Sequence, residues 1–333
     1  MAALLCHLHA RDVTEVMLLV PPHDVHLLRP LLAAQWPWPL RIQPDDRLLK
    51  HSHVAAYRLQ MIFKLFLAQI IRTEFYLILD SDCVAVWPIH VEQLLHRTIA
   101  TDHQNQSFYR AVYQIEGRAS HEKWWSESEQ LLQARLAECS TDGQVASSTI
   151  GVTSIILSRS ISLTTLCRLQ KLYGDFLPTM ANWALWRLMF GGMWTEYTLY
   201  YLTGRCTNTF DTYHVHHSNL SSNDSLPALN LYGHSIWSSV DWTPTSRQYL
   251  RASIERGLKW RRREIEQANG HAVLDTSSKV HSLFTVLQGR HNVDPVLYHE
   301  NFYPLFIEYL KQQKNAEELV VLLDTMSRQF HGN

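Results

Sequence analysis

The sequence lacks the features that mark several common protein classes. Its five cysteines form no C-x-x-C pair, which excludes zinc ribbons, zinc fingers and thioredoxin-type redox motifs. One or two disulfides remain possible among them. No apolar run approaches the about 20 residues that a membrane-spanning helix needs. The first residues, Met1–Cys6, have neither a basic nor a long apolar region, so they make a poor signal peptide.

Charge of one sign is also missing. Lys and Arg total 30 against 31 Asp and Glu, so the net charge of -1 gives no general attraction to nucleic acid or anionic lipid. The only basic run, Lys259–Arg263, is interrupted by glutamates at helical spacing. It predicts a solvated helix face, with nucleic-acid binding as the alternative.

Three enzyme motifs are absent as well: G-x-G-x-x-G, the P-loop and the G-x-S-x-G elbow. The sequence therefore does not support dinucleotide binding, Walker-type nucleotide binding or α/β-hydrolase activity.

What is present indicates a folded protein with a substantial core. Hydrophobic residues make up 46% of the 333 residues and charged residues 18%, which suits one large α/β domain or two smaller ones. The 19 His and 11 Trp are numerous. Three N-x-S sequences, at Asn105, Asn219 and Asn223, are weak evidence of a secretory history.

The first third of the chain alternates between strand and helix patterns. Glu15–Val20 and Leu40–Gln43 are short apolar strands, and a helix is expected between them over Asp24–Gln35. Tyr57–Ile71 has helical periodicity. Phe75–Leu79 is an apolar run that predicts a central parallel strand, so the whole pattern indicates an α/β domain.

Further elements are expected downstream. We predict helices over 121–139, 161–173, 183–202 and 247–267, a strand over 150–157, and one or two helices over 302–330.

The sharpest chemical signal follows the strand at 75–79. Asp80 and Asp82 lie two residues apart after an apolar strand, so on an extended chain both side chains point to one side. Two carboxylates at a strand's carboxyl end suit Mg²⁺ or Mn²⁺ bound together with substrate phosphates. The alternative is an ordinary turn or helix N-cap.

At this point the chain resembles a known family. The Q-x-x-x-K-L pattern of helix Tyr57–Leu65 and the YLILDSD strand ending at Asp82 are similar to motifs of GT-A-type nucleotide-sugar glycosyltransferases. Segments Gly151–Arg159 and Trp194–Tyr200 resemble two further motifs of a poorly characterised glycosyltransferase family of bacteria and algae. The likeness runs from about residue 15 to 240, and four motifs in order are far more specific than D-x-D alone.

The resemblance implies a Rossmann-like GT-A domain over 1–245, with a mixed, mostly parallel sheet flanked by helices. A C-terminal helical extension over 246–333 is expected to pack on it. Two departures from the family pattern are expected to matter. Ala2–Arg11 matches the helix that follows the first strand, and Glu15–Val20 matches the second strand, so the first strand is expected to be missing; Ser154 stands where related segments have Pro.

The resemblance also implies site roles. The donor would be a nucleoside-diphosphate sugar and the acceptor a glycan, protein or small-molecule hydroxyl, with Mn²⁺ or Mg²⁺ on Asp80 and Asp82. Gln60 and Lys64, four apart on one helix face, would bind the donor, where Lys64 suits a phosphate. Glu196 would orient an acceptor hydroxyl or act as general base.

Trp194 would stack on a sugar ring. Each of these side chains also has a structural alternative: Lys64 as a snorkelling lysine, Glu196 as an ordinary helix carboxylate and Trp194 as a core residue.

A late histidine often completes such a metal site. The candidates are His214, His216, His217 and His234, and we favour His234 because it follows the acceptor segment. His214 and His216 would share one strand face, which also suits zinc, but no third and fourth ligands match.

Two other functions stay open. A non-catalytic relative could keep the fold as a binding or scaffold module, which the apparently missing strand favours and the intact motifs disfavour. A metal-dependent phosphohydrolase would need more clustered His and Asp ligands than the sequence offers. The compartment is expected to be the secretory or Golgi lumen if an N-terminal anchor is missing from this chain, and the cytoplasm otherwise.

Overall fold

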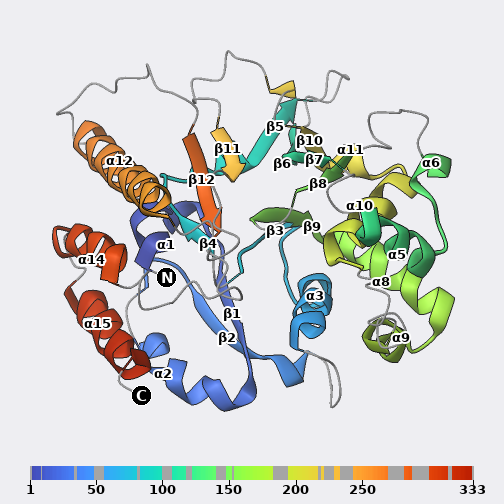
Figure 1. Cartoon of the computed structure of the whole chain (residues 1–333), viewed down its shortest axis with the longest axis horizontal. Coiled ribbons are helices and arrows are strands. Elements are labelled where there is room, and N and C mark those ends of the chain that lie inside the picture. Colours follow the sequence, from blue (N-terminus) through green and yellow to red (C-terminus); the bar gives the residue numbers. More distant parts are fainter. Residues whose placement is uncertain are drawn as a thin grey trace. The chain divides into compact units, whose positions relative to one another are not determined.

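A computed structural model describes sixteen stretches of the chain: residues 2–8, 10–33, 36–48, 56–80, 83–99, 107–117, 122–139, 148–151, 154–182, 194–216, 219–220, 229–232, 243–268, 281–286, 300–313 and 317–331. They form a mixed α/β structure of small parallel and antiparallel sheets flanked by helices (Figure 1). The chain divides into two compact units, each assembled from separated segments. The first contains Met1–Pro44, Leu79–Gln93 and Ser222–Asn333, and the second contains Asp45–Ile78 and Leu94–Ser221.

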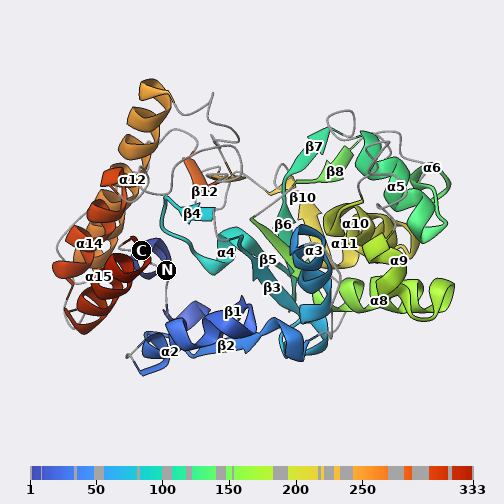
Figure 2. The same ribbon diagram turned by 60° about the horizontal axis from the view of Figure 1, so that its bottom comes forward.

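The first unit begins with a strand–helix–strand element. Strands β1 (Val16–Val20) and β2 (Leu40–Pro44) pair in parallel, and α2 (Val25–Ala33) connects them. Figure 2 shows α2 beside this strand pair. The predictions for these elements are confirmed, and every residue of β1 is half-buried.

A three-stranded sheet of the first unit has the order β11-β12-β4. It consists of β11 (Leu229–Tyr232), β12 (His281–Val286) and β4 (Cys83–Ala85); β12 runs parallel to β11 and antiparallel to β4. No sequence periodicity had indicated these strands. Their partners lie far apart along the chain, which hides such short strands from local patterns.

The C-terminal helices belong to the same unit as the N-terminal helix. Helix α1 (Ala2–His7) packs against α12 (Pro244–Ala268) and α14 (Tyr303–Lys311), and α15 (Glu317–His331) packs on α14 (Figure 1). At Gly257 the backbone of α12 lies close to the backbone of Val86. A Cβ atom at this position would lie 2.1 Å from the Val86 carbonyl oxygen, so only glycine fits there without a shift. The helices expected at 247–267 and 302–330 are confirmed.

The described residues of the second unit form three small sheets. Strand β3 (Phe75–Ile78) pairs with β9 (Ile155–Ser158), β10 (His214–His216) and β5 (Leu95–Ile99) flank β6 (Ser107–Tyr113), and β7 (Ile115–Gly117) pairs with β8 (Ser148–Ile150). The β3–β9 pair is antiparallel, so the expectation of a parallel strand at 75–79 is wrong. A continuous apolar run indicates burial on both faces but carries no information on direction.

Neither direction dominates the pairing. Among the strands that the structure describes, three pairs are parallel and four are antiparallel. This confirms a mixed sheet structure but not the expected parallel majority.

Helices surround these sheets in the described part of the second unit. They are α3 (Ala56–Phe66), α5 (Glu122–Leu132), α6 (Leu136–Cys139), α8 (Arg159–Tyr173), α9 (Phe176–Asn182), α10 (Glu196–Cys206) and α11 (Phe210–Tyr213). One short helix, α4 (Val91–Leu94), spans the boundary of the two units in the sequence. Single 3-10 turns are η1 (Ala10–Asp12), η2 (Pro22–Asp24), η3 (Asp45–Arg47) and η4 (Leu67–Gln69).

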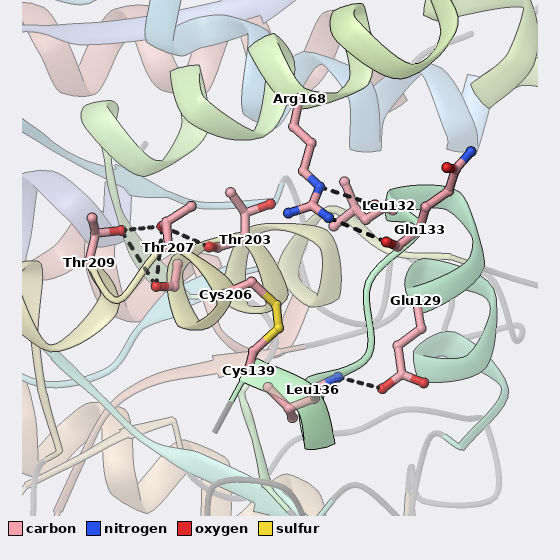
Figure 3. Close-up of a disulfide and its surroundings, with 11 residues drawn as sticks. Glu129, Leu132, Gln133, Leu136, Cys139, Arg168, Thr203, Cys206, Thr207 and Thr209 are labelled. Atoms are coloured by element: carbon pink, nitrogen blue, oxygen red, sulfur yellow. Dashed lines mark hydrogen bonds between the residues drawn. A yellow bond between two sulfur atoms is a disulfide. The ribbon is translucent and has the colours of Figure 1, made fainter. Parts of the chain in front are cut away.

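The helix expected over 121–139 is two helices. Between them, Gln133 has a positive φ of 48° and ends α5. Arg168 of α8 donates from Nε to the carbonyl of Leu132 at 3.0 Å and from its guanidinium to that of Gln133 at 3.4 Å (Figure 3). A contact from a distant helix therefore caps α5 where no Gly or Pro marked its end.

Helix α10 forms the core of the second unit. Its first ten residues, Glu196–Arg205, are all buried, and α3, α5, α6 and α8 pack around it. It begins with a capping box: Thr195 Oγ1 accepts from the Thr198 backbone N–H at 3.2 Å, and Thr198 Oγ1 accepts from the Thr195 N–H at 3.3 Å. The N-terminus of this central helix is thus fixed within the core.

Candidate functional site

Two predicted site residues from motifs far apart in the sequence meet in the second unit. Lys64 of α3 and Glu196 of α10 form an ion pair, with Nζ 2.8 Å from Oε1. The side chains are only 10% and 3% exposed, so water screens the pair little. A charge-assisted contact this short in a buried place is a strong, directional one.

Tyr197 completes this small cluster. Lys64 Nζ donates to its hydroxyl oxygen at 3.2 Å and also lies 5.0 Å from the centre of its ring. The sequence analysis did not single out Tyr197. The signal that could have found it is its place directly after Glu196, inside the same W-T-E-Y segment. We call Lys64, Glu196 and Tyr197 the ion-pair cluster.

Two local features place positive charge beside Glu196. This residue is the first of α10, where several backbone N–H groups lack helical partners and the helix dipole is positive. The Lys64 ammonium group adds a full positive charge beside it. The carboxylate is therefore stabilised from two sides, by the helix end and by the lysine.

Strand β3 holds helix α3 at this point. The Tyr76 hydroxyl donates to the backbone carbonyl of Lys64 at 3.0 Å and shares a 2.7 Å hydrogen bond with Ser162 of α8. Burial raises the pKa of the Tyr76 hydroxyl, so it stays protonated and can keep donating. Tyr76 thus joins three elements and places the backbone that carries the Lys64 side chain.

Strand β9 is joined to α10 in a similar way. The Ser158 backbone N–H donates to the Tyr200 hydroxyl at 2.7 Å. At the same strand end, Glu74 accepts from the Ser158 hydroxyl at 2.6 Å and from the Ser160 N–H at 3.2 Å, which caps α8. Elements α3, β3, β9 and the start of α10, which hold parts of all four motifs, are therefore neighbours in the second unit.

His214 lies in the core beside this arrangement. Its Nε2 is 2.6 Å from the Tyr200 hydroxyl, and its ring stacks on Phe210 with centroids 4.4 Å apart. Because the Tyr200 oxygen already accepts from Ser158, its proton points to Nε2, which makes that nitrogen an acceptor. Burial lowers the pKa of His214 to about 3, so the ring is neutral. The contact with Tyr200 occupies one of the two ring nitrogens through which a histidine can bind a metal.

Trp194 is also in the core. Its ring is fully buried, its indole N–H donates to the Met180 carbonyl at 3.3 Å, and the Arg58 guanidinium lies 5.9 Å from the ring centre. Sugar stacking needs a ring face that is open to the ligand. In this structure the Trp194 ring is instead packed in the core and its N–H group is hydrogen-bonded.

Gln60 and Lys64 differ in their surroundings. Both are on α3, four residues apart, but Gln60 is exposed while Lys64 is buried. Only Lys64 of this predicted pair belongs to the ion-pair cluster.

The predicted metal ligands are only partly described. Asp80 is half-buried, and its carbonyl accepts from the Cys83 N–H at 3.0 Å. Asp82 and His234 lie outside the described residues. Within the stretches that are described, no group of three or more His, Cys, Asp and Glu side chains is close enough together to hold a metal ion.

A disulfide fixes the other end of α10. Cys206 at its C-terminus is bonded to Cys139 of α6 (Figure 3). This confirms that disulfides are possible in this chain, but the pairing could not be read from the spacing of five cysteines.

The fold and the cluster together define a mixed α/β protein with a buried, charged cluster at a helix N-terminus. The chain belongs to a family of unknown function, DUF6492, whose model matches residues 1–254. No curated protein matches the chain, and no solved structure does. Within the part of the chain that the structure describes, no helix is both long and apolar enough to cross a membrane.

Proposed function

We propose that this protein is a metal-dependent glycosyltransferase with a GT-A-type fold, which moves a sugar from a nucleoside-diphosphate sugar to a hydroxyl acceptor. The observation that carries the proposal is the convergence of parts of the four motif segments in the second unit; the chain from Leu79 to Gln93, with Asp80, belongs to the first unit. Helix α3, strands β3 and β9 and the start of α10 pack together, and two of the residues chosen for chemistry, Lys64 and Glu196, are in direct contact.

In this proposal the ion-pair cluster links donor binding to base activation. Lys64 is a cation that can turn to a diphosphate, since a phosphate competes with a carboxylate for an ammonium group. When Lys64 moves to the donor, Glu196 loses its charge partner and becomes free to accept a proton. Tyr197, which accepts from the same ammonium group, would guide that movement.

The bond changes balance without any further reactant. The acceptor oxygen forms a bond to the anomeric carbon, the bond from that carbon to the diphosphate oxygen breaks, and the nucleoside diphosphate leaves with the electron pair. The acceptor proton goes to the Glu196 carboxylate. Gln60, exposed on α3, would contact the donor.

Asp80 and Asp82 have the hard oxygen donors that Mg²⁺ and Mn²⁺ prefer, and they follow directly on β3. A metal there would neutralise charge on the departing diphosphate. His234 remains the proposed additional ligand. His214 is the weaker candidate, because Tyr200 already contacts its Nε2.

Donor hydrolysis with and without Mn²⁺ tests the proposal. We expect Asp82→Ala to reduce the rate by at least about 100-fold, since a metal supplies several kcal/mol of charge stabilisation. The matched control is Asp175→Ala, which removes an exposed carboxylate from the turn between α8 and α9. An Asp82→Ala rate equal to that of wild type would refute the metal role.

A non-catalytic scaffold is the second candidate, and a specific observation favours it. Lys64 and Glu196 already satisfy each other's charge in the core, and Trp194 is buried. Calorimetry with UDP, GDP and Mn²⁺ separates the two candidates, because a scaffold should bind no nucleotide. Release of inorganic phosphate in the same assays would instead identify a phosphohydrolase.

A further inference from the structure

The proposed function makes no use of the three N-x-S sequences of the chain. Asn105 and Asn223 lie outside the described residues. Asn219, in Asn219-Leu220-Ser221, is described and its side chain is exposed. A short polar side chain, a residue other than Pro and then a hydroxyl residue form the acceptor sequence for N-glycosylation.

The disulfide gives independent evidence on the compartment. Cys139 and Cys206 have Cα atoms 4.5 Å apart, within the range that a disulfide requires. Both residues are half-buried, so small reductants can reach them. Such a bond persists in an oxidising lumen and is rare where glutathione keeps thiols reduced. The compartment that forms this bond in a eukaryotic cell is also the one that attaches N-linked glycans.

The position of Asn219 fits a bulky modification. It follows strand β10, whose His214 and Val215 are buried, and it belongs to the same compact unit as the disulfide. At Asn219 the side chain is exposed. A glycan on this side chain therefore extends into water and does not require the core of the unit to open.

We propose that Asn219 carries an N-linked oligosaccharide, added in the oxidising lumen where the Cys139–Cys206 disulfide forms. The co-reactant is a lipid-diphosphate-linked oligosaccharide. The side-chain nitrogen of Asn219 forms a bond to the anomeric carbon of the sugar, the bond between that carbon and the diphosphate oxygen breaks, and the lipid diphosphate leaves with the electron pair. The amide nitrogen gives up one proton to the solvent, which balances the step. The modification does not depend on the proposed transferase activity.

The test uses the full chain purified from the cells that produce it. Digestion with a peptide N-glycosidase in heavy-oxygen water converts a glycosylated Asn to a labelled Asp, which peptide mass spectrometry locates. We expect label at Asn219 and a faster-running band on gels after digestion. Asn208, which is also exposed but has Phe210 in place of the hydroxyl residue, should stay unlabelled when fragment ions locate the label within the peptide.

Variants expressed in the same cells complete the test. Asn219→Gln and Ser221→Ala should each remove the gel shift that the Asn219 glycan causes, whereas Ser222→Ala, outside all three acceptor sequences, should keep it. Because Ser221→Ala leaves Asn219 in place, it keeps the test valid if Asn219→Gln fails to fold. An unlabelled Asn219 peptide, or label on Asn105 or Asn223 alone, would overturn the proposal.

Discussion

The Cys139–Cys206 disulfide should contribute a large share of the stability of the second unit. It joins the short helix α6 to the C-terminus of the central helix α10 and closes a separation of 67 residues. In the chain-entropy account, a cross-link lowers the entropy of the unfolded chain by an amount that grows with loop length. For this loop that amounts to about 4 kcal/mol at room temperature.

Contacts in the folded protein determine how much of this stabilisation is lost when the disulfide is removed. Helix α6 keeps other attachments without the bond, because Glu129 accepts from the Leu136 N–H at 3.1 Å and the Leu136 side chain is fully buried (Figure 3). The reduced protein should therefore fold to the same structure. We expect the Cys139→Ser/Cys206→Ser double variant to lose about 2 to 4 kcal/mol of unfolding free energy.

The assay is urea unfolding of the oxidised wild type and the double variant, followed by circular dichroism and, for α10 specifically, by amide hydrogen exchange. The second readout is needed because a chain with two units need not unfold in one step. Cys167→Ser is the control: it removes an exposed free thiol and should change stability by less than about 0.5 kcal/mol. A loss below about 1 kcal/mol in the double variant would refute the loop-entropy reasoning.

Three further changes should alter stability in defined ways. Burial lowers the pKa of both His7 and His214 from 6.5 to about 3. Between these two pH values the unfolded chain therefore binds more protons than the folded chain does. The free energy of unfolding should fall by up to about 1.4 kcal/mol per pH unit for each histidine from about pH 6.5 down to pH 3. Unfolding curves at several pH values check this, and a stability that is constant from pH 7 to pH 4 would contradict it. Gly257→Ala should cost about 1 to 3 kcal/mol despite the better helix propensity of Ala, because its Cβ would lie 2.1 Å from the Val86 carbonyl oxygen; thermal melting against the exposed neighbour Arg256→Ala measures the difference, and equal melting temperatures would count against the close approach. Glu74→Ala should cost about 1 to 3 kcal/mol, since it leaves the donors at the start of α8 without their acceptor; Glu74→Gln should recover part of this loss, and equal losses in the two variants would argue against the cap.

Elements with their own local signals could be predicted from the sequence. Helix α3 has apolar residues at helical spacing, and the α2 helix and the β2 strand are separated by the Trp36–Pro39 segment with its two prolines. The direction of β3 could not be predicted. Its four residues are apolar or aromatic throughout, and its partner β9 lies about 80 residues downstream. Strand direction is decided by that distant pairing, which no local pattern contains.

The break between α5 and α6 shows the same limit. Gln133 and Ala134 carry no turn signal, and a helical pattern continues through them. The positive φ of Gln133 is accompanied by two hydrogen bonds that Arg168 makes from another helix. Tertiary contacts override local propensity at such positions.

At the candidate site, residue types can be predicted from the sequence but their contacts cannot. The sequence predicts Lys64 as a phosphate ligand and Glu196 as a base, from motifs more than a hundred residues apart. Nothing in either motif says that the two side chains touch. Tyr76 and Tyr197, which hold Lys64 through its carbonyl and its ammonium group, looked like ordinary aromatic residues of a strand and a helix. Their roles depend on single hydroxyl contacts made in three dimensions.

The ion-pair cluster is difficult to explain by stability alone. Two charges taken out of water lose hydration energy that their attraction only partly returns, and well-packed apolar side chains of similar volume often serve as well or better. The surrounding helices supply many such side chains, since Leu65, Leu199 and Leu202 are fully buried nearby on α3 and α10. A lysine, a glutamate at a helix N-terminus and a tyrosine hydroxyl in that place therefore provide something that packing does not require. In the proposed reaction, Lys64 exchanges Glu196 for the diphosphate and Glu196 exchanges Lys64 for the acceptor hydroxyl. Such an exchange gives a reason for placing two charged groups in the core, so the ion pair also supports the proposed catalytic role.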